Sequence, residues 1–167
     1  MSLLPNFING DFVAPSSVGC IDVIAPATGE KIAQVPRSTA KDVDTAVKAA
    51  REAFPAWSGM TLKARAAIMF KFHALVDAHS TELANIIVRE NGKNLAEALA
   101  DVAKGNETAE WATGLPQIAA GRQLEVSRGV TCQETREPLG VVAAIVPFNF
   151  PGNFFFFPIV IYIEIKY

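Results

Sequence analysis

The chain has 167 residues, half of them hydrophobic, and a formal net charge of −2. This length suffices for one domain with a sizeable core, and the lack of a basic stripe excludes nucleic acid as the main partner. The two cysteines, Cys20 and Cys132, lie too far apart in sequence for a metal-ligand pair and are too few for a disulfide framework, so we expect a reduced, cytoplasmic setting. Residues 1–6 resemble neither a secretory signal nor an Arg-rich presequence.

The first 35 residues are typical of short strands. Residues 6–13 predict two strands around a tight turn at Asn9-Gly10. Residues 21–24 and 31–35 predict two more, separated by a turn over 26–30. We expect a small antiparallel arm that lies on a larger body.

From Thr39 the apolar spacing becomes helical. The first helix begins there and ends or breaks at Pro55. Three more are predicted at 61–78, 81–90 and from Leu95 to about Trp111. We expect Asn91-Gly92 to end the third helix. The apolar faces are predicted to comprise Ile68, Met69, Phe72, Leu75 and Val76 on the second helix, and Leu95, Leu99 and Val102 on the fourth.

Other residues capable of chemistry have ordinary explanations. His73 and His79 are six residues apart, which is not the spacing of a helical metal pair, so no metal site is expected. Both cysteines are interpreted as packing residues. Glu90 and Lys93 are interpreted as solvated residues at a helix end rather than an acid–base pair.

The residues after 121 change pattern again. Residues 122–137 alternate polar and apolar types around Gly129, which predicts a two-stranded ribbon. Residues 140–146 form an uncharged, β-branched run that predicts a buried strand. Pro147 and Pro151 then force a turn around Asn149. A rigid amide at a strand end suits stabilisation of an oxyanion, but Asn in a turn often only bonds its own backbone.

The chain resembles the aldehyde dehydrogenases through six segments that occur in the expected order. Within that family it is most similar to the CoA-acylating methylmalonate-semialdehyde dehydrogenases. The reason is Phe148 in place of the commoner tryptophan, followed by Phe150-Pro151, together with Arg136-Glu137-Pro138-Leu139-Gly140. The six segments are Phe7-Ile8-Asn9-Gly10, Pro26-Ala27-Thr28-Gly29-Glu30, Ala53-Phe54-Pro55-Ala56-Trp57, Glu90-Asn91-Gly92-Lys93, Pro138-Leu139-Gly140-Val141-Val142 and Pro147-Phe148-Asn149-Phe150-Pro151.

The resemblance implies an α/β fold, of which residues 1–151 are the incomplete N-terminal part: an antiparallel arm, several helices, a hairpin and the first strand of the nucleotide-binding sheet. Asn149 would hold the oxyanion formed when a cysteine thiolate attacks the aldehyde. Val146, Pro147 and Phe148 would border bound NAD, and coenzyme A would accept the acyl group from a small semialdehyde. The ribbon 122–137 would serve homo-oligomerisation. The resemblance leaves a mitochondrial location of the parent enzyme open.

The resemblance ends at Pro151, and residues 152–167 are interpreted as an aberrant apolar tail. Their Phe, Ile, Tyr, Asn and Lys content suits A/T-rich codons, which favours a retained intron, a frameshift or a gene-model error. The family's catalytic cysteine and general-base glutamate are not found, so the chain is expected to be inactive alone. The alternative is a non-catalytic module that pairs with full-length subunits. Membrane association through 141–165 is disfavoured by three prolines and Glu164.

Overall fold

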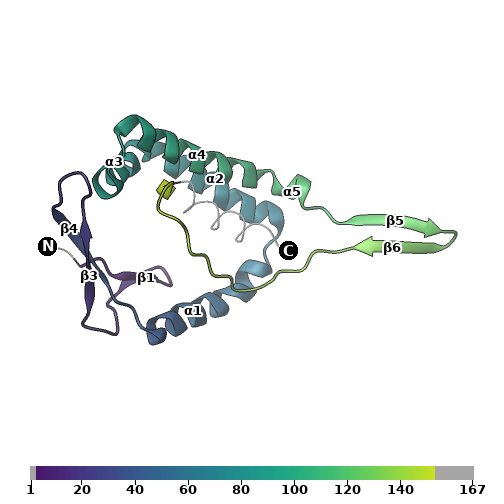
Figure 1. Cartoon of the computed structure of the whole chain (residues 1–167). Coiled ribbons are helices and arrows are strands. Elements are labelled where there is room, and N and C mark those ends of the chain that lie inside the picture. Colours follow the sequence, from purple (N-terminus) through teal and green to yellow (C-terminus); the bar gives the residue numbers. More distant parts are fainter. Residues whose placement is uncertain (1–2, 153–167) are drawn as a thin grey trace.

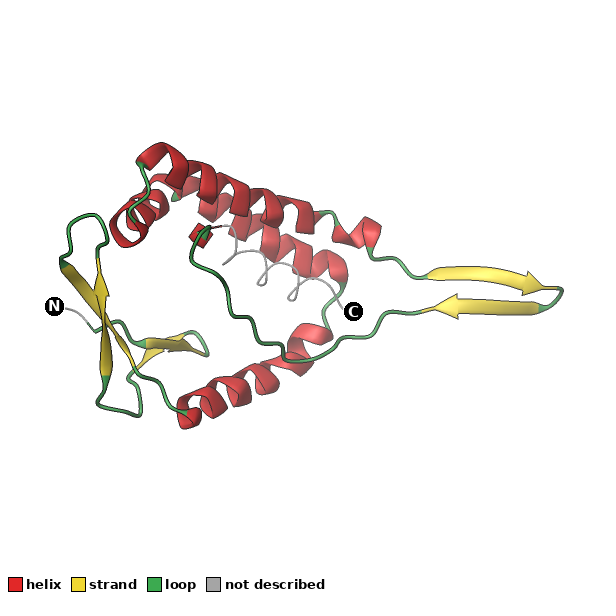
Figure 2. Ribbon diagram, in the orientation of Figure 1, coloured by secondary structure: helices red, strands yellow, loops and turns green. Residues whose placement is uncertain are grey.

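The computed structural model describes residues 3–152, and helix residues outnumber strand residues in this part of the chain (Figures 1 and 2). The order is two β-hairpins, four long helices, a short helical turn and a third hairpin. The elements are β1 (Asn6–Ile8), β2 (Asp11–Val13), β3 (Cys20–Ile24), β4 (Lys31–Pro36), α1 (Ala40–Ser58), α2 (Leu62–Ala78), α3 (Ser80–Asn91), α4 (Leu95–Thr113), α5 (Leu115–Ile118), β5 (Arg122–Ser127) and β6 (Val130–Glu134).

The predicted N-terminal arm is confirmed as two antiparallel pairs, β1–β2 and β3–β4, which form separate sheets. Asn9 and Gly10 both have positive φ, 55° and 85°, as the tight two-residue turn requires. The arm is attached to α1 through Asp42, whose carboxylate accepts hydrogen bonds from the backbone N–H and the hydroxyl of Ser16. It also accepts from the backbone N–H of Thr39, the residue that precedes α1.

The prediction that Pro55 ends or breaks the first helix was wrong. α1 continues three residues further, to Ser58. A proline removes one N–H and crowds the carbonyl four residues earlier, and only the last turn of α1 lies beyond it. The following residues restore the bonding there, because the N–H of Gly59 donates to the Pro55 carbonyl at 3.1 Å.

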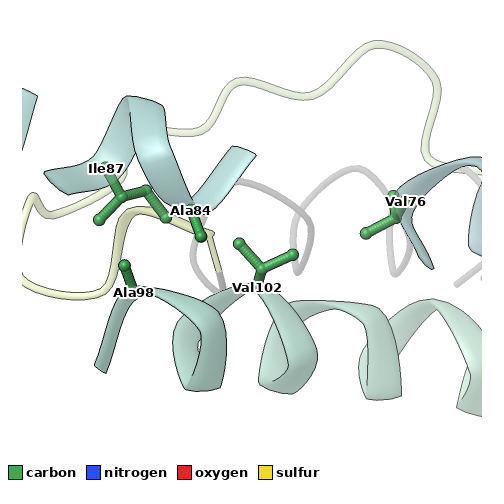
Figure 3. Packing of buried hydrophobic residues seen from close by; sticks show 5 residues of the cluster. All are labelled: Val76, Ala84, Ile87, Ala98 and Val102. Atoms are coloured by element: carbon green, nitrogen blue, oxygen red, sulfur yellow. The ribbon is translucent and has the colours of Figure 1, made fainter. Parts of the chain in front are cut away.

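The core lies among α2, α3 and α4. One buried cluster joins the three helices through Val76, Ala84, Ile87, Ala98 and Val102 (Figure 3). A second cluster joins α2 to the C-terminal half of α4 through Met69, Ala109 and Ala112. Small side chains on the buried stripe of α4 allow α2 and α3 to approach its backbone closely.

The predicted helix faces were only partly right. Met69 and Val76 of α2 are buried, but Ile68 and Leu75 are 42% and 59% exposed. On α4 the prediction of Val102 is confirmed, but Leu95 and Leu99 are exposed, and Ala98 faces the core beside Val102. Periodicity identified the helices, but here it could not choose between two adjacent apolar stripes.

The ribbon predicted at 122–137 is confirmed as the antiparallel hairpin β5–β6, which projects away from the helices (Figure 1). Gly129 occupies its tip with a φ of 78°, and the register shifts between Glu125 and Ser127. Every residue of both strands is exposed. The hairpin therefore adds nothing to the core described here.

The predicted strand at 140–146 is not formed. Residues 135–147 belong to no helix or strand, and 141–150 are exposed throughout. A strand needs a hydrogen-bonded neighbour, and none of the described residues supplies one. The apolar side chains of this segment are exposed: Val141, Val142 and Val146 are each about 40% exposed and Ile145 is 101% exposed.

Candidate functional site

The candidate site lies where the extended segment 141–147 returns to α4. Phe148 to Phe150 form a bend, and Pro151-Gly152 begin a helical turn. Gly152 is buried against α4, where an added Cβ would lie 3.1 Å from the Asp101 carbonyl oxygen and 3.3 Å from Cα of Val102. A glycine at this position permits the backbone of the returning segment to contact the backbone of α4.

The residue before Asn149 is tied to the end of α3. Nδ2 of Asn91 donates a hydrogen bond to the Phe148 carbonyl oxygen at 3.0 Å. Asn91 is the last residue of α3, and Gly92 follows in the left-handed conformation with φ of 84°. This confirms the predicted helix end. It also gives the Asn91 amide a role that local pattern did not suggest.

The residue after Asn149 is packed over a lysine. The Nζ atom of Lys93 lies 4.6 Å from the centre of the Phe150 ring, within the range of a cation–π contact. The same Nζ donates to Oδ2 of Asp101 at 2.6 Å. The interpretation of Lys93 as a solvated residue was therefore wrong, since its side chain is only 18% exposed; Glu90 is exposed, as expected.

Asn149 is exposed at the edge of an open surface depression where β3, α3 and the bend meet. Among the described residues its side chain makes no hydrogen bond to its own turn, which was the alternative to a functional role. Asn149 thus lies exposed between two neighbours, each of which contacts another part of the chain. The depression is lined by Ile24, Pro26, Glu90, Asn91, Phe148 and Asn149.

Val146, Pro147 and Phe148 immediately precede Asn149 in the chain, and of these three Phe148 also lines the depression. Val146 is 40% and Phe148 83% exposed, and Pro147 is exposed as well. Exposed apolar side chains next to a polar group fit one side of a planar ring such as nicotinamide. Their role toward NAD remains a prediction.

The histidines and cysteines lie in other parts of the fold. Nδ1 of His79 lies 2.9 Å from Glu82 at the surface, and Nδ1 of His73 lies 3.4 Å from the Asn106 carbonyl oxygen. Across residues 3–152 no group of three or more His, Cys, Asp or Glu side chains is arranged to hold a metal ion. Cys20 in β3 and Cys132 in β6 are both exposed, so their interpretation as packing residues was wrong.

Within the described part of the chain, no helix is both long and apolar enough to cross a bilayer. The alternative of membrane association concerned residues 141–165. Of these, 141–152 are described and form no long helix, whereas 153–165 lie outside the described residues.

The sequence model of the aldehyde dehydrogenase family matches residues 12–163. Malonate-semialdehyde dehydrogenase 1 of Geobacillus kaustophilus (strain HTA426) is 45% identical over 151 residues, which are 90% of this chain and 31% of that protein. The sequence alone led us to place the end of the resemblance at Pro151, but the family match continues to residue 163. The assignment of 152–167 as an aberrant tail remains a prediction.

Two solved structures support the same relationship. The methylmalonate-semialdehyde dehydrogenase DddC of Oceanimonas doudoroffii superposes with a TM-score of 0.90 at 34% identity, covering 96% of this chain and 33% of that one. PnpE in complex with nicotinamide adenine dinucleotide gives a TM-score of 0.90 at 32% identity, covering 96% and 33%. The chain thus spans about a third of the length of the relatives that it matches.

Proposed function

The chain belongs to the aldehyde dehydrogenase family, and we propose that it is the N-terminal piece of an NAD-dependent, CoA-acylating malonate- or methylmalonate-semialdehyde dehydrogenase. The substrate class is supported by the relatives of that name, of which one is 45% and another 34% identical. NAD is supported by the related structure that holds this dinucleotide.

The observation that carries the proposal is the exposed amide of Asn149 between two anchored neighbours. The Phe148 carbonyl is bound by Asn91 and the Phe150 ring lies on Lys93. A donor held in place before the reaction stabilises developing negative charge without reorganisation at the moment of reaction. An amide that was free to rotate would lose part of this advantage.

In the proposed mechanism, the Asn149 amide donates a hydrogen bond to the aldehyde oxygen as a thiolate attacks the carbonyl carbon. Val146, Pro147 and Phe148 would contact one side of NAD and exclude water from it. The chemistry that bound NAD would supply is acceptance of a hydride from the carbon to which the thiolate has added. Overall, one aldehyde, one NAD⁺ and one CoA thiol give one thioester, NADH and a proton.

The chain's own cysteines do not suit the role of that thiolate. Cys132 lies in the projecting hairpin and Cys20 at the start of β3, and neither lines the depression that contains Asn149. We therefore propose that the chain alone is inactive. The nucleophile and the general base would come from sequence beyond this chain, and the complete enzyme would be a cytoplasmic homo-oligomer.

A second candidate function is a non-catalytic module that pairs with full-length subunits. The observation in its favour is the hairpin β5–β6, on which Leu124, Val126 and Val130 are 52–65% exposed. Exposed apolar side chains on a two-stranded ribbon suit association with another chain. If the chain co-purifies with an intact relative and the Leu124→Lys variant does not, this function is supported. If the chain itself does not co-purify, this function is refuted.

NADH formation decides between the two functions. The purified chain should give no NADH from malonate semialdehyde, NAD and CoA. A hybrid in which residues 1–151 replace the matching part of the Geobacillus kaustophilus enzyme should give NADH in a CoA-dependent reaction. Turnover by the chain alone would refute the inactivity, and a folded but inactive hybrid would refute the enzyme assignment.

A further inference from the structure

We propose that Asn91 and Lys93 are positioning residues: the last residue of α3 and the segment that follows it hold both neighbours of Asn149 and thereby set the direction of its amide. The inference rests on the proposed function of Asn149. It goes further because it names two residues that hold the Asn149 amide in its position and direction, although both precede Asn149 by more than fifty positions in the sequence.

The first contact fixes the backbone before Asn149. The Asn91 side chain donates to the Phe148 carbonyl oxygen at 3.0 Å, which orients the peptide plane that joins Phe148 to Asn149. Asn91 is itself held as the C-terminal residue of α3. The Gly92 turn after it lies against the arm, where an added Cβ would come within 3.0 Å of Cγ of Pro26.

The second contact fixes the side chain after Asn149. Nζ of Lys93 lies 4.6 Å from the Phe150 ring centre and 2.6 Å from Oδ2 of Asp101. The Asp101 side chain is 5% exposed, so the ion pair is largely withdrawn from water and screened less than a surface pair. Lys93 therefore presents its charge to the ring from a fixed place.

These contacts have a specific consequence for the returning segment. Residues 141–150 are exposed and belong to no helix or strand. Their described anchors are the Phe148 carbonyl, the Phe150 ring and the buried Gly152. Removal of the Lys93 charge takes away the cation that the Phe150 ring contacts, so the turn at Asn149 should change position. Even a misplacement of about 1 Å is enough to lower a rate about 100-fold.

The first test uses the 167-residue chain labelled with ¹⁵N. In Lys93→Met, the backbone and side-chain amide signals of Asn149 should shift or broaden. In Lys104→Met they should stay in place, because Lys104 pairs with exposed Glu107 on the surface of α4. Asn91→Ala provides a second, milder variant in case Lys93→Met fails to fold. Unchanged Asn149 signals in a folded Lys93→Met or Asn91→Ala chain would overturn the proposal.

The second test is a kinetic cycle in the hybrid enzyme. Lys93→Met should lower kcat about 10- to 100-fold with little change in KM, and Lys93→Arg should restore much of the loss. If Lys93 acts through Asn149, the double variant Lys93→Met/Asn149→Ala should be no slower than Asn149→Ala. A multiplicative loss, or no effect of Lys93→Met beside a strong effect of Asn149→Ala, would overturn the inference.

The two tests separate the inference from the proposed function. If Asn149→Ala leaves kcat unchanged, the oxyanion role of Asn149 fails. The NMR comparison then still decides whether Lys93 and Asn91 position this residue, because that measurement needs no catalysis.

Discussion

Lys93 and Asp101 form an ion pair of 2.6 Å that joins the segment after α3 to the first half of α4. Only 18% of the lysine side chain and 5% of the aspartate side chain are exposed. Breaking an ion pair this enclosed costs more stability than breaking the exposed pair Lys104–Glu107, although both contain a lysine and a carboxylate.

The first prediction concerns this pair. Lys93→Met leaves the Asp101 carboxylate buried without its partner, so it should lower the free energy of unfolding by about 3–5 kcal/mol. Lys104→Met should cost about 0–1 kcal/mol. Urea unfolding followed by circular dichroism measures both. Equal losses in the two variants would show that burial of the Lys93–Asp101 pair has no energetic consequence.

The second prediction concerns Gly92 at the end of α3. Gly92→Ala forces a side chain into the left-handed conformation, which costs about 1–2 kcal/mol, and places its Cβ 3.0 Å from Cγ of Pro26. Gly29→Ala is the matched control, because Gly29 also has positive φ, 73°, but open space around its Cβ. Denaturant unfolding should show a larger loss for Gly92→Ala. A loss no greater than that of Gly29→Ala would mean that Pro26 moves aside.

The third prediction concerns pH. Hydrogen bonds from the Thr39 backbone and the Ser16 side chain hold the pKa of Asp42 well below its usual range. A carboxylate with a depressed folded-state pKa stabilises the fold above its unfolded pKa, about 3.9, and this contribution is lost as pH falls further through the folded value. Stability should therefore decline below about pH 4.

The Asp42 contribution can be isolated by substitution. The Asp42→Asn variant should be less stable than the parent at pH 7. Its stability should also fall less steeply than that of the parent as the pH is lowered, because the contribution of the Asp42 carboxylate is already missing. Asp44→Asn removes the same charge from an exposed position two residues further along α1. Unfolding midpoints measured from pH 7 to pH 2 give the comparison; identical curves for the parent and Asp42→Asn would contradict it.

Helix ends and turns that depend on a few adjacent residues were mostly predicted correctly from the sequence. Thr61 precedes α2, and its hydroxyl accepts from the Ala64 N–H, while Gly92 ends α3 in the left-handed conformation; both signals need only a few adjacent residues. Gly129 marked the hairpin tip in the same way.

The errors came from interactions between distant residues. The run 140–146 has the composition of a strand, but composition cannot provide the neighbouring strand that would pair with it. Lys93 was interpreted as solvated because its partner, Asp101, is eight residues away across a helix start, and Phe150 is further still. Asn149 was found through a proline-flanked pattern, but the groups that position it could not be found that way.

The fourth prediction concerns the exposed run 141–146. Ile145 is 101% exposed, so Ile145→Lys removes no packing and places a charge in an apolar, β-branched segment. Light scattering at rising protein concentration should show less aggregation, with an unchanged unfolding midpoint. Ile86→Lys on α3, where Ile86 is 46% exposed, controls for the added charge. An equal effect of both variants would show that net charge, rather than this segment, governs aggregation.

The central claim is that Asn149 is an oxyanion donor, and kcat of the hybrid enzyme tests it most directly. Asn149→Ala should lower kcat about 10²- to 10³-fold, while the protein folds as the parent does and KM for the semialdehyde changes little. A kcat within about threefold of the parent, which corresponds to less than about 0.7 kcal/mol of transition-state stabilisation, would contradict the claim.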